Sequence, residues 1–129
     1  MGVSTDGILA YGYDLGGEGE WKVQGLNDDG EPSWPWYDSD EGDLVGDVGE
    51  ALAAKVPGVE VVTHCSGEHP MCLLASREVT AYRGWVEDVT DVVAVDLTAD
   101  RERLDAALAT LGIIPIQKEP RWLLVSYRG

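Results

Sequence analysis

Residues 7 to 13, Gly-Ile-Leu-Ala-Tyr-Gly-Tyr, alternate large and small side chains. Successive side chains of a β-strand point to opposite faces of the sheet, so this alternation predicts a strand. One face would carry the larger side chains, Leu9, Tyr11 and Tyr13. The other face would carry Ile8, Ala10 and Gly12. Because Ala and Gly are small, a helix or a ligand could approach this second face closely.

Two helix patterns follow in the chain. Residues 43 to 56 predict a helix because apolar residues recur every four positions, at Leu44, Val48, Leu52 and Val56. Residues 98 to 111 predict a second helix, with leucines along one side. Thr98 is a suitable capping residue at its start, and Gly112 is suited to the left-handed conformation that ends a helix.

Four further segments have strand patterns. Residues 59 to 64 predict a buried strand, and residues 71 to 83 predict a second strand broken near Arg77. These two should form an antiparallel hairpin. Residues 91 to 97 are a weaker strand candidate. Residues 122 to 127 are apolar on both faces, which predicts a central strand.

The order of these elements predicts an α+β fold. We expect a four- to five-stranded mixed or antiparallel sheet with two helices packed on one face, and the ferredoxin-like split β-α-β arrangement is one topology with this order. The length of 129 residues is typical of one domain. We therefore expect a single domain over residues 1 to 129, with a long acidic loop insertion at about 14 to 41.

The formal net charge of −15 constrains the binding partners. Such a charge repels nucleic acid and anionic membranes and favours a protein partner with a basic surface. The charge is uneven, because residues 14 to 50 hold twelve acidic residues against Lys22 alone. No apolar run is long enough to span a bilayer, and the N-terminus lacks the features of a secretory signal. We therefore expect a cytoplasmic protein.

Three stretches resemble a known group of proteins. They are MGVSTDGILAYGY at residues 1 to 13, HCSGEHPMCLLA at residues 64 to 75 and RWLLVSYRG at residues 121 to 129. Together they resemble small acidic proteins of actinobacteria and their phages. The resemblance implies a phage or mobile-element context, and hence the host cytoplasm. The group has no established activity, so the resemblance transfers no catalytic residue.

The densest set of reactive side chains lies between residues 64 and 72. It comprises His64, Cys65, His69 and Cys72, all of which are possible zinc ligands. Adjacent strand residues point to opposite faces, so at best three of the four could converge. Cys65 beside a histidine could also act as a thiolate nucleophile. The alternative is a structural hairpin in which Cys72 packs in the core and Cys65 stays accessible.

The acidic insertion carries the candidate binding residues. They are Asp28, Asp29, Glu31, Trp34, Trp36, Tyr37, Asp38, Asp40 and Glu41. Exposed tryptophans rimmed by carboxylates are typical of a protein-binding hot spot. Alternatively, the two tryptophans fold back over the sheet. The other three tryptophans, Trp21, Trp85 and Trp122, are expected in the core.

No motif predicts a cofactor. The glycine-rich residues 15 to 19 lack the Lys-Ser/Thr ending of a phosphate-binding loop, and the acidic run from Asp38 does not match an EF-hand. We therefore expect a non-enzymatic interaction module that acts through the acidic, tryptophan-bearing loop. One alternative is a nucleic-acid mimic that inhibits a DNA-binding host protein. The other is a small metal-binding or cysteine-dependent enzyme centred on residues 64 to 72.

Overall fold

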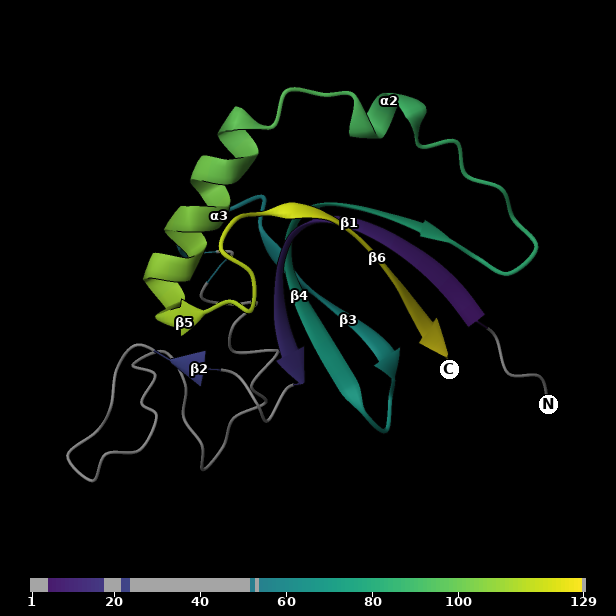
Figure 1. Ribbon diagram of the computed structural model, residues 1–129, viewed down its shortest axis with the longest axis horizontal. Helices are drawn as coiled ribbons and strands as arrows, with labels where there is room; N and C mark the ends of the chain where they lie inside the picture. Colours follow the sequence, from purple (N-terminus) through teal and green to yellow (C-terminus); the bar gives the residue numbers. More distant parts are fainter. Residues whose placement is uncertain (1–4, 18–21, 24–51, 53, 129) are drawn as a thin grey trace.

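The computed structural model describes residues 5–17, 22–23, 52 and 54–128 (Figure 1). Four long strands form the main sheet: β1 (Thr5–Gly17), β3 (Glu60–Ser66), β4 (Pro70–Ala81) and β6 (Arg121–Arg128). A second, two-stranded sheet pairs β2 (Lys22–Val23) with β5 (Ile113–Ile114). The described residues include the helices α2 (Thr90–Val93) and α3 (Thr98–Leu111). The predicted α+β fold class is confirmed.

The main sheet has the strand order expected for a split β-α-β arrangement. β1 and β4 lie side by side, β6 flanks β1 and β3 flanks β4, and these three pairings are antiparallel. The sheet differs from an open one because β3 and β6 also meet. They pair in parallel at Cys65–Tyr127 and Ser66–Arg128, which closes the sheet into a barrel. The hairpin predicted for β3 and β4 is confirmed.

β4 is continuous over 12 residues, so the predicted break near Arg77 is wrong. What the sequence signals there is an irregular register. Tyr11 pairs with Arg77 while the next residue, Gly12, pairs with Ala75, so Ser76 is an extra residue in β4. An inserted residue of this kind bends a strand and increases its twist, which helps the sheet to curl.

The sheet has an outer face, which carries α3, and an inner face. Tyr11 and Tyr13, two of the three larger residues predicted for one side of β1, lie in the main hydrophobic cluster with residues of β4 and α3, whereas Leu9 lies outside it. Its members are Tyr11, Tyr13, Leu15, Leu52, Val56, Val59, Cys72, Leu74, Leu104, Ala107, Leu111 and Ile113. A smaller inner cluster is formed by Ala10, Leu73 and Ala75. The predicted alternation of β1 therefore separates two packing layers.

Two strands are less buried than their sequences predict. Residues 60 to 64 of β3 are half-buried or exposed, and of the predicted segment only Val59 is buried. β6 is central in its pairing, as predicted, but it is not covered on both faces, because Leu124 is 80% exposed. On the outer face of β6, Trp122 packs against the main cluster, and its ring lies 5.3 Å from that of Tyr11.

The start of α3 is fixed by Asp96 rather than by Thr98. Thr98 is the first helical residue, and its backbone N–H and its hydroxyl donate to Asp96 Oδ1 at 3.0 and 2.7 Å. The predicted end is confirmed. Gly112 has φ 67° and donates its N–H to the Leu108 carbonyl at 2.8 Å. A left-handed glycine satisfies an otherwise unpaired carbonyl at the helix end.

The strand predicted over residues 91 to 97 is wrong, because the chain forms the single-turn helix α2 there. Asp88 accepts a hydrogen bond from the Thr90 N–H at 3.0 Å, and such local capping favours a helical turn over a strand. α2 buries no residue. Whether another strand lies beside residues 91 to 97 is not visible in their own sequence.

The helix predicted over residues 43 to 56 lies largely outside the described residues. Its described positions 52, 54 and 55 are helical, and Leu52 and Val56 are buried in the main cluster. Among the described helices, none has the length and apolar character needed to cross a membrane.

The hydroxyl of the buried Tyr13 ties β1 to α3 by donating to Asp105 Oδ1 at 2.7 Å. Tyr13→Phe should reduce the free energy of unfolding by about 1 kcal/mol in urea titrations, because one hydrogen bond to a charged acceptor is lost. Burial, followed by Asp105, raises the pKa of Tyr13 above its ordinary value of 10. The folded state therefore holds this proton more tightly, and its contribution to stability declines as the pH rises above 10.

Tyr82→Phe, at an exposed tyrosine, is the control. The expectation fails if both variants lose the same stability at neutral pH, or if the stability difference between wild type and Tyr13→Phe does not shrink as the pH rises above 10.

Candidate functional site

The binding residues predicted in the acidic insertion cannot be placed. They lie outside the described residues and are Asp28, Asp29, Glu31, Trp34, Trp36, Tyr37, Asp38, Asp40 and Glu41. Their role stays a prediction. Two described regions carry candidate site residues, the β3–β4 hairpin and the connection from β4 to α3.

The β3–β4 hairpin does not bring its four candidate ligands together. Cys72 pairs with Thr63 and is buried in the main cluster, on the outer face. His64 pairs with the next residue, Met71, so it belongs to the opposite face. Cys65 is exposed, and His69 is exposed in the turn. Among the residues described here, no three His, Cys, Asp or Glu side chains are grouped to hold a metal ion.

His64 is poorly placed for acid–base chemistry. Its Nε2 is buried and has no hydrogen-bond partner within the described part of the chain. Burial lowers the pKa of His64, and the charge of Asp14 opposes this shift only in part. A neutral imidazole does not readily form the thiolate–imidazolium ion pair that would activate Cys65.

The two cysteines should differ sharply in reactivity. Cys65 is exposed and has φ 74°, a left-handed conformation that is rare outside glycine, whereas Cys72 is fully buried. An aromatic disulfide reagent should therefore label one thiol of the native chain quickly, and Cys65→Ser should abolish this fast phase. Rapid labelling of both thiols before unfolding, or persistence of the fast phase in Cys65→Ser, would contradict the described packing.

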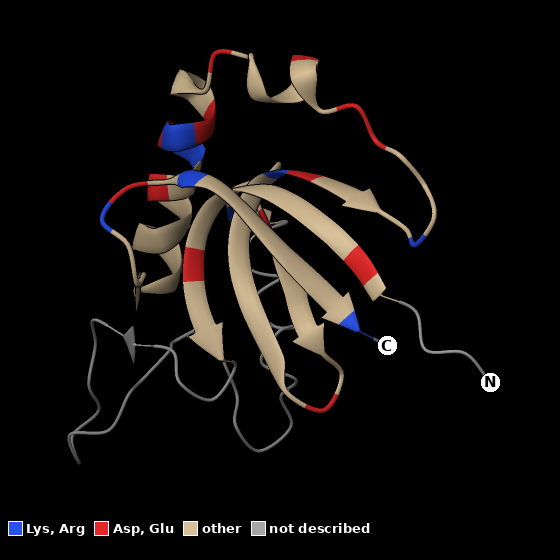
Figure 2. Ribbon diagram, turned by 45° about the vertical axis from the view of Figure 1, so that its right-hand side comes forward, with Lys and Arg blue, Asp and Glu red and all other residues tan. Residues whose placement is uncertain are grey.

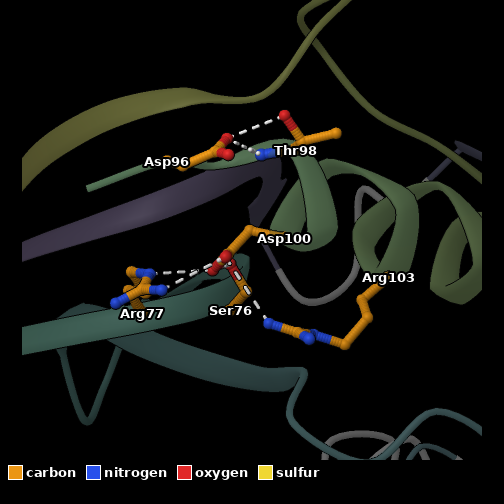
Figure 3. Close-up of polar contacts among 6 residues, drawn as sticks. All are labelled: Ser76, Arg77, Asp96, Thr98, Asp100 and Arg103. Carbon is orange, nitrogen blue, oxygen red and sulfur yellow. Dashed lines mark hydrogen bonds and ion pairs between the residues drawn. The ribbon is translucent and has the colours of Figure 1, made fainter.

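The most connected charged group is Asp100 in the first turn of α3 (Figure 3). Its buried carboxylate accepts from the Ser76 hydroxyl at 2.7 Å and from Arg77 Nε at 2.9 Å. Arg103 Nη2 lies 3.5 Å from the other carboxylate oxygen. Burial raises the pKa of Asp100, but the hydrogen bonds from Arg77 and Ser76 and the charges of Arg77 and Arg103 outweigh it and hold the pKa below the ordinary value.

These contacts occupy both oxygens of the Asp100 carboxylate. Ser76 is the extra residue of β4, so the irregular register places its hydroxyl and Arg77 where they meet the end of α3. A carboxylate that is buried, ionised and hydrogen-bonded on both oxygens is suited to fixing a helix on a sheet. We assign the Asp100 cluster a structural role.

The connection from β4 to α3, residues 82 to 97, exposes large apolar side chains, and we call it the arm. Trp85 is 69% exposed and Val86 is 95% exposed. The ring of Tyr82 stands edge-on to that of Trp85, with 6.3 Å between the ring centroids. The backbone N–H of Trp85 donates to the Tyr82 carbonyl at 2.8 Å. Val93 of α2 is also exposed. The expectation that Trp85 belongs to the core is therefore wrong.

Carboxylates follow these apolar side chains along the arm. The arm contains four acidic residues against Arg83, and all five are exposed; the acids are Glu87, Asp88, Asp91 and Asp96. Figure 2 shows them spaced along the arm. Hydrogen bonds from Thr90 and Thr98 lower the pKa values of Asp88 and Asp96. These two carboxylates therefore remain charged at neutral pH and in mildly acidic solution.

The sequence held a signal for this surface that the pattern of strands obscured. Trp85 follows Gly84, which adopts φ 83°, and precedes Val86, Glu87 and Asp88. A glycine turn followed by two acids marks the end of a strand and a chain segment in water. Trp85 thus resembles the tryptophans of the acidic insertion in its sequence surroundings more than it resembles Trp122.

Comparison of the chain with protein-family models, with curated proteins and with solved structures finds no match. A function is therefore inferred from the exposed aromatic and acidic side chains of the arm.

Proposed function

We propose that this protein is a non-enzymatic interaction module that binds a protein partner through a surface with basic and apolar groups. The observation that carries the proposal is the arm, where Tyr82, Trp85 and Val86 are exposed together among carboxylates. Aromatic side chains supply most of the binding energy in many protein interfaces, and surrounding charges select the partner and speed its approach.

The overall charge supports a basic protein as the partner. A net charge of −15 disfavours direct contact with nucleic acid or an anionic membrane. The acidic insertion adds Trp34 and Trp36, and we propose that it forms a second part of the binding surface. A phage or mobile-element protein that modulates a host protein in the cytoplasm fits this chemistry. The β3–β4 hairpin gives little support to the enzymatic alternative, because its candidate ligands lie on different faces.

A capture experiment with matched variants tests the proposal. The intact protein is immobilised and exposed to an actinobacterial lysate, and the retained proteins are identified by mass spectrometry. We expect basic proteins that are released by salt, since exposed charges are screened at high ionic strength. Trp85→Ala/Val86→Ser should retain them less, and Trp34→Ala/Trp36→Ala shows what the insertion contributes.

The control is Ile116→Ser, which alters an exposed apolar residue outside the arm. The proposal fails if both double variants retain the same proteins as the wild type and in the same amounts. Loss of binding in Ile116→Ser alone would also overturn it, because it would place the binding surface elsewhere.

A further inference from the structure

We infer that the arm and the uncovered half of the outer sheet face together form a docking site for a basic amphipathic helix of the partner protein. This inference rests on the proposed function and specifies its site and ligand. The site as argued contains no residue of the acidic insertion. Its parts come from four places in the sequence, which are the first half of β1, the end of β4, the arm and the middle of β6.

The outer face carries an apolar row that α3 does not reach. Leu9 pairs with Val79 on one side and with Leu124 on the other, so the three side chains lie in a row across β4, β1 and β6. Leu9 shares its face with Tyr11, which packs beneath α3. The row is therefore the continuation of the hydrophobic surface on which α3 sits. Leu124 is 80% exposed, whereas Leu9 and Val79 are half-buried.

The arm stands on this same side of the sheet. Figures 1 and 2 both show residues 82 to 97 arching from the end of β4 over the outer side to the start of α3. Leu9 and Val79 are half-buried, whereas Leu124 and Trp85 are largely exposed, so the arm does not cover Leu124. Within the part of the chain that the structure describes, the arm and the β6 end of the row thus present apolar side chains to solvent.

A helix from another protein is the occupant that these features fit. The outer face already packs helical segments, α3 and the described helical residues 52, 54 and 55, against β1 and β4. A helix with one apolar stripe would extend that layer over the remaining row. Its opposite, polar side would face the four carboxylates of the arm, which select basic residues such as Lys and Arg.

A second copy of this chain fits poorly. Two copies would bring together two bodies of net charge −15, and such self-repulsion opposes association. The arm of the second copy would also bring its own carboxylates, with Arg83 as the one basic residue of the segment. The charges therefore favour a basic partner over self-association.

The test uses the full chain and a synthetic helical peptide of Leu and Lys, with Leu along one stripe and Lys elsewhere. Its affinity is measured by isothermal titration calorimetry and compared with that of a peptide of the same composition in scrambled order. We expect Leu124→Ser and Trp85→Ser each to weaken binding of the striped peptide at least about tenfold. Ile116→Ser, at an exposed apolar residue outside the site, should change it less than about twofold.

Circular dichroism confirms that the variants are folded, which is expected because the three side chains are largely exposed. Equal affinity of the striped and scrambled peptides, or an unchanged affinity in Leu124→Ser, overturns the inference. A wild-type dimer that Leu124→Ser dissociates also overturns it in favour of a second copy. If Trp85 variants lose lysate partners while Leu124→Ser keeps both partners and peptide, the docking site falls but the proposed function stands.

Discussion

Gly12→Ala is expected to reduce the free energy of unfolding by about 3 kcal/mol, at the upper end of the usual penalty for overpacking. A Cβ atom added at Gly12 would lie 1.8 Å from the Leu74 carbonyl oxygen and 2.8 Å from its carbonyl carbon. Both atoms belong to the backbone of β4, so no side chain can move aside. β1 and β4 would have to separate at the position where the extra residue Ser76 already bends the pair.

Gly7→Ala is the matched control, because it makes the same change in the same strand. Nothing among the described residues lies within 4 Å of a Cβ added at Gly7. Alanine also restricts the unfolded chain more than glycine does, so this variant should be neutral or stabilised by up to about 0.5 kcal/mol. Urea unfolding followed by circular dichroism compares the two. Similar stabilities for Gly12→Ala and Gly7→Ala would contradict the close approach of β1 and β4.

Asp100→Asn should cost about 2 to 3 kcal/mol of stability at neutral pH. The change removes a buried charge that accepts two hydrogen bonds from Arg77 and one from Ser76. Breaking a fully buried ion pair costs more, but Arg77 and Arg103 are partly exposed and water can solvate them once the carboxylate is gone. Glu102→Gln makes the same chemical change at an exposed position of α3 and should have a small effect.

The pH dependence of Asp100→Asn gives a second readout. Because the pKa of Asp100 is lower in the folded state than its ordinary value of 3.8, its charge stabilises the fold fully above that value. The contribution disappears as the pH falls through the lowered folded pKa. The stability difference between wild type and Asp100→Asn should therefore be constant near neutrality and shrink below about pH 4. A difference that grows in acid would contradict the assignment of Asp100 as an ionised anchor.

The sequence was sufficient to predict the parts of the fold that depend on local patterns. The alternation in β1 placed Tyr11 and Tyr13 together on one face, and Gly112 marked the end of α3. The helix packs on this face of larger side chains, although the small side chains of the opposite face had suggested that a helix could come close there. The closure of the sheet was not predictable, because it depends on the pairing of Cys65 and Ser66 with the last residues of β6, far away in the chain. The contact of Asp100 with Ser76 also depends on one extra residue in β4.

The sequence predicted an acidic surface that carries tryptophan, but it placed this surface in the insertion and not in the arm. Trp85 was expected in the core, and residues 91 to 97 were interpreted as a strand. Asp88 and Asp96 instead accept hydrogen bonds from the Thr90 and Thr98 N–H groups at the starts of α2 and α3, and Trp85 is exposed in the arm. Hydropathy cannot distinguish these outcomes, since Val92, Val93 and Val95 suit a strand and a helical turn almost equally.

We propose that residues 82 to 97 and the outer face beside them bind a basic partner protein. Two-dimensional NMR of the isotope-labelled chain during titration with the striped Leu/Lys peptide tests it most directly. We predict that the backbone amide signals which shift first and furthest belong to the arm and to residues 123 to 125 of β6. Shifts confined to the β3–β4 hairpin, or spread evenly over the whole chain, would contradict it.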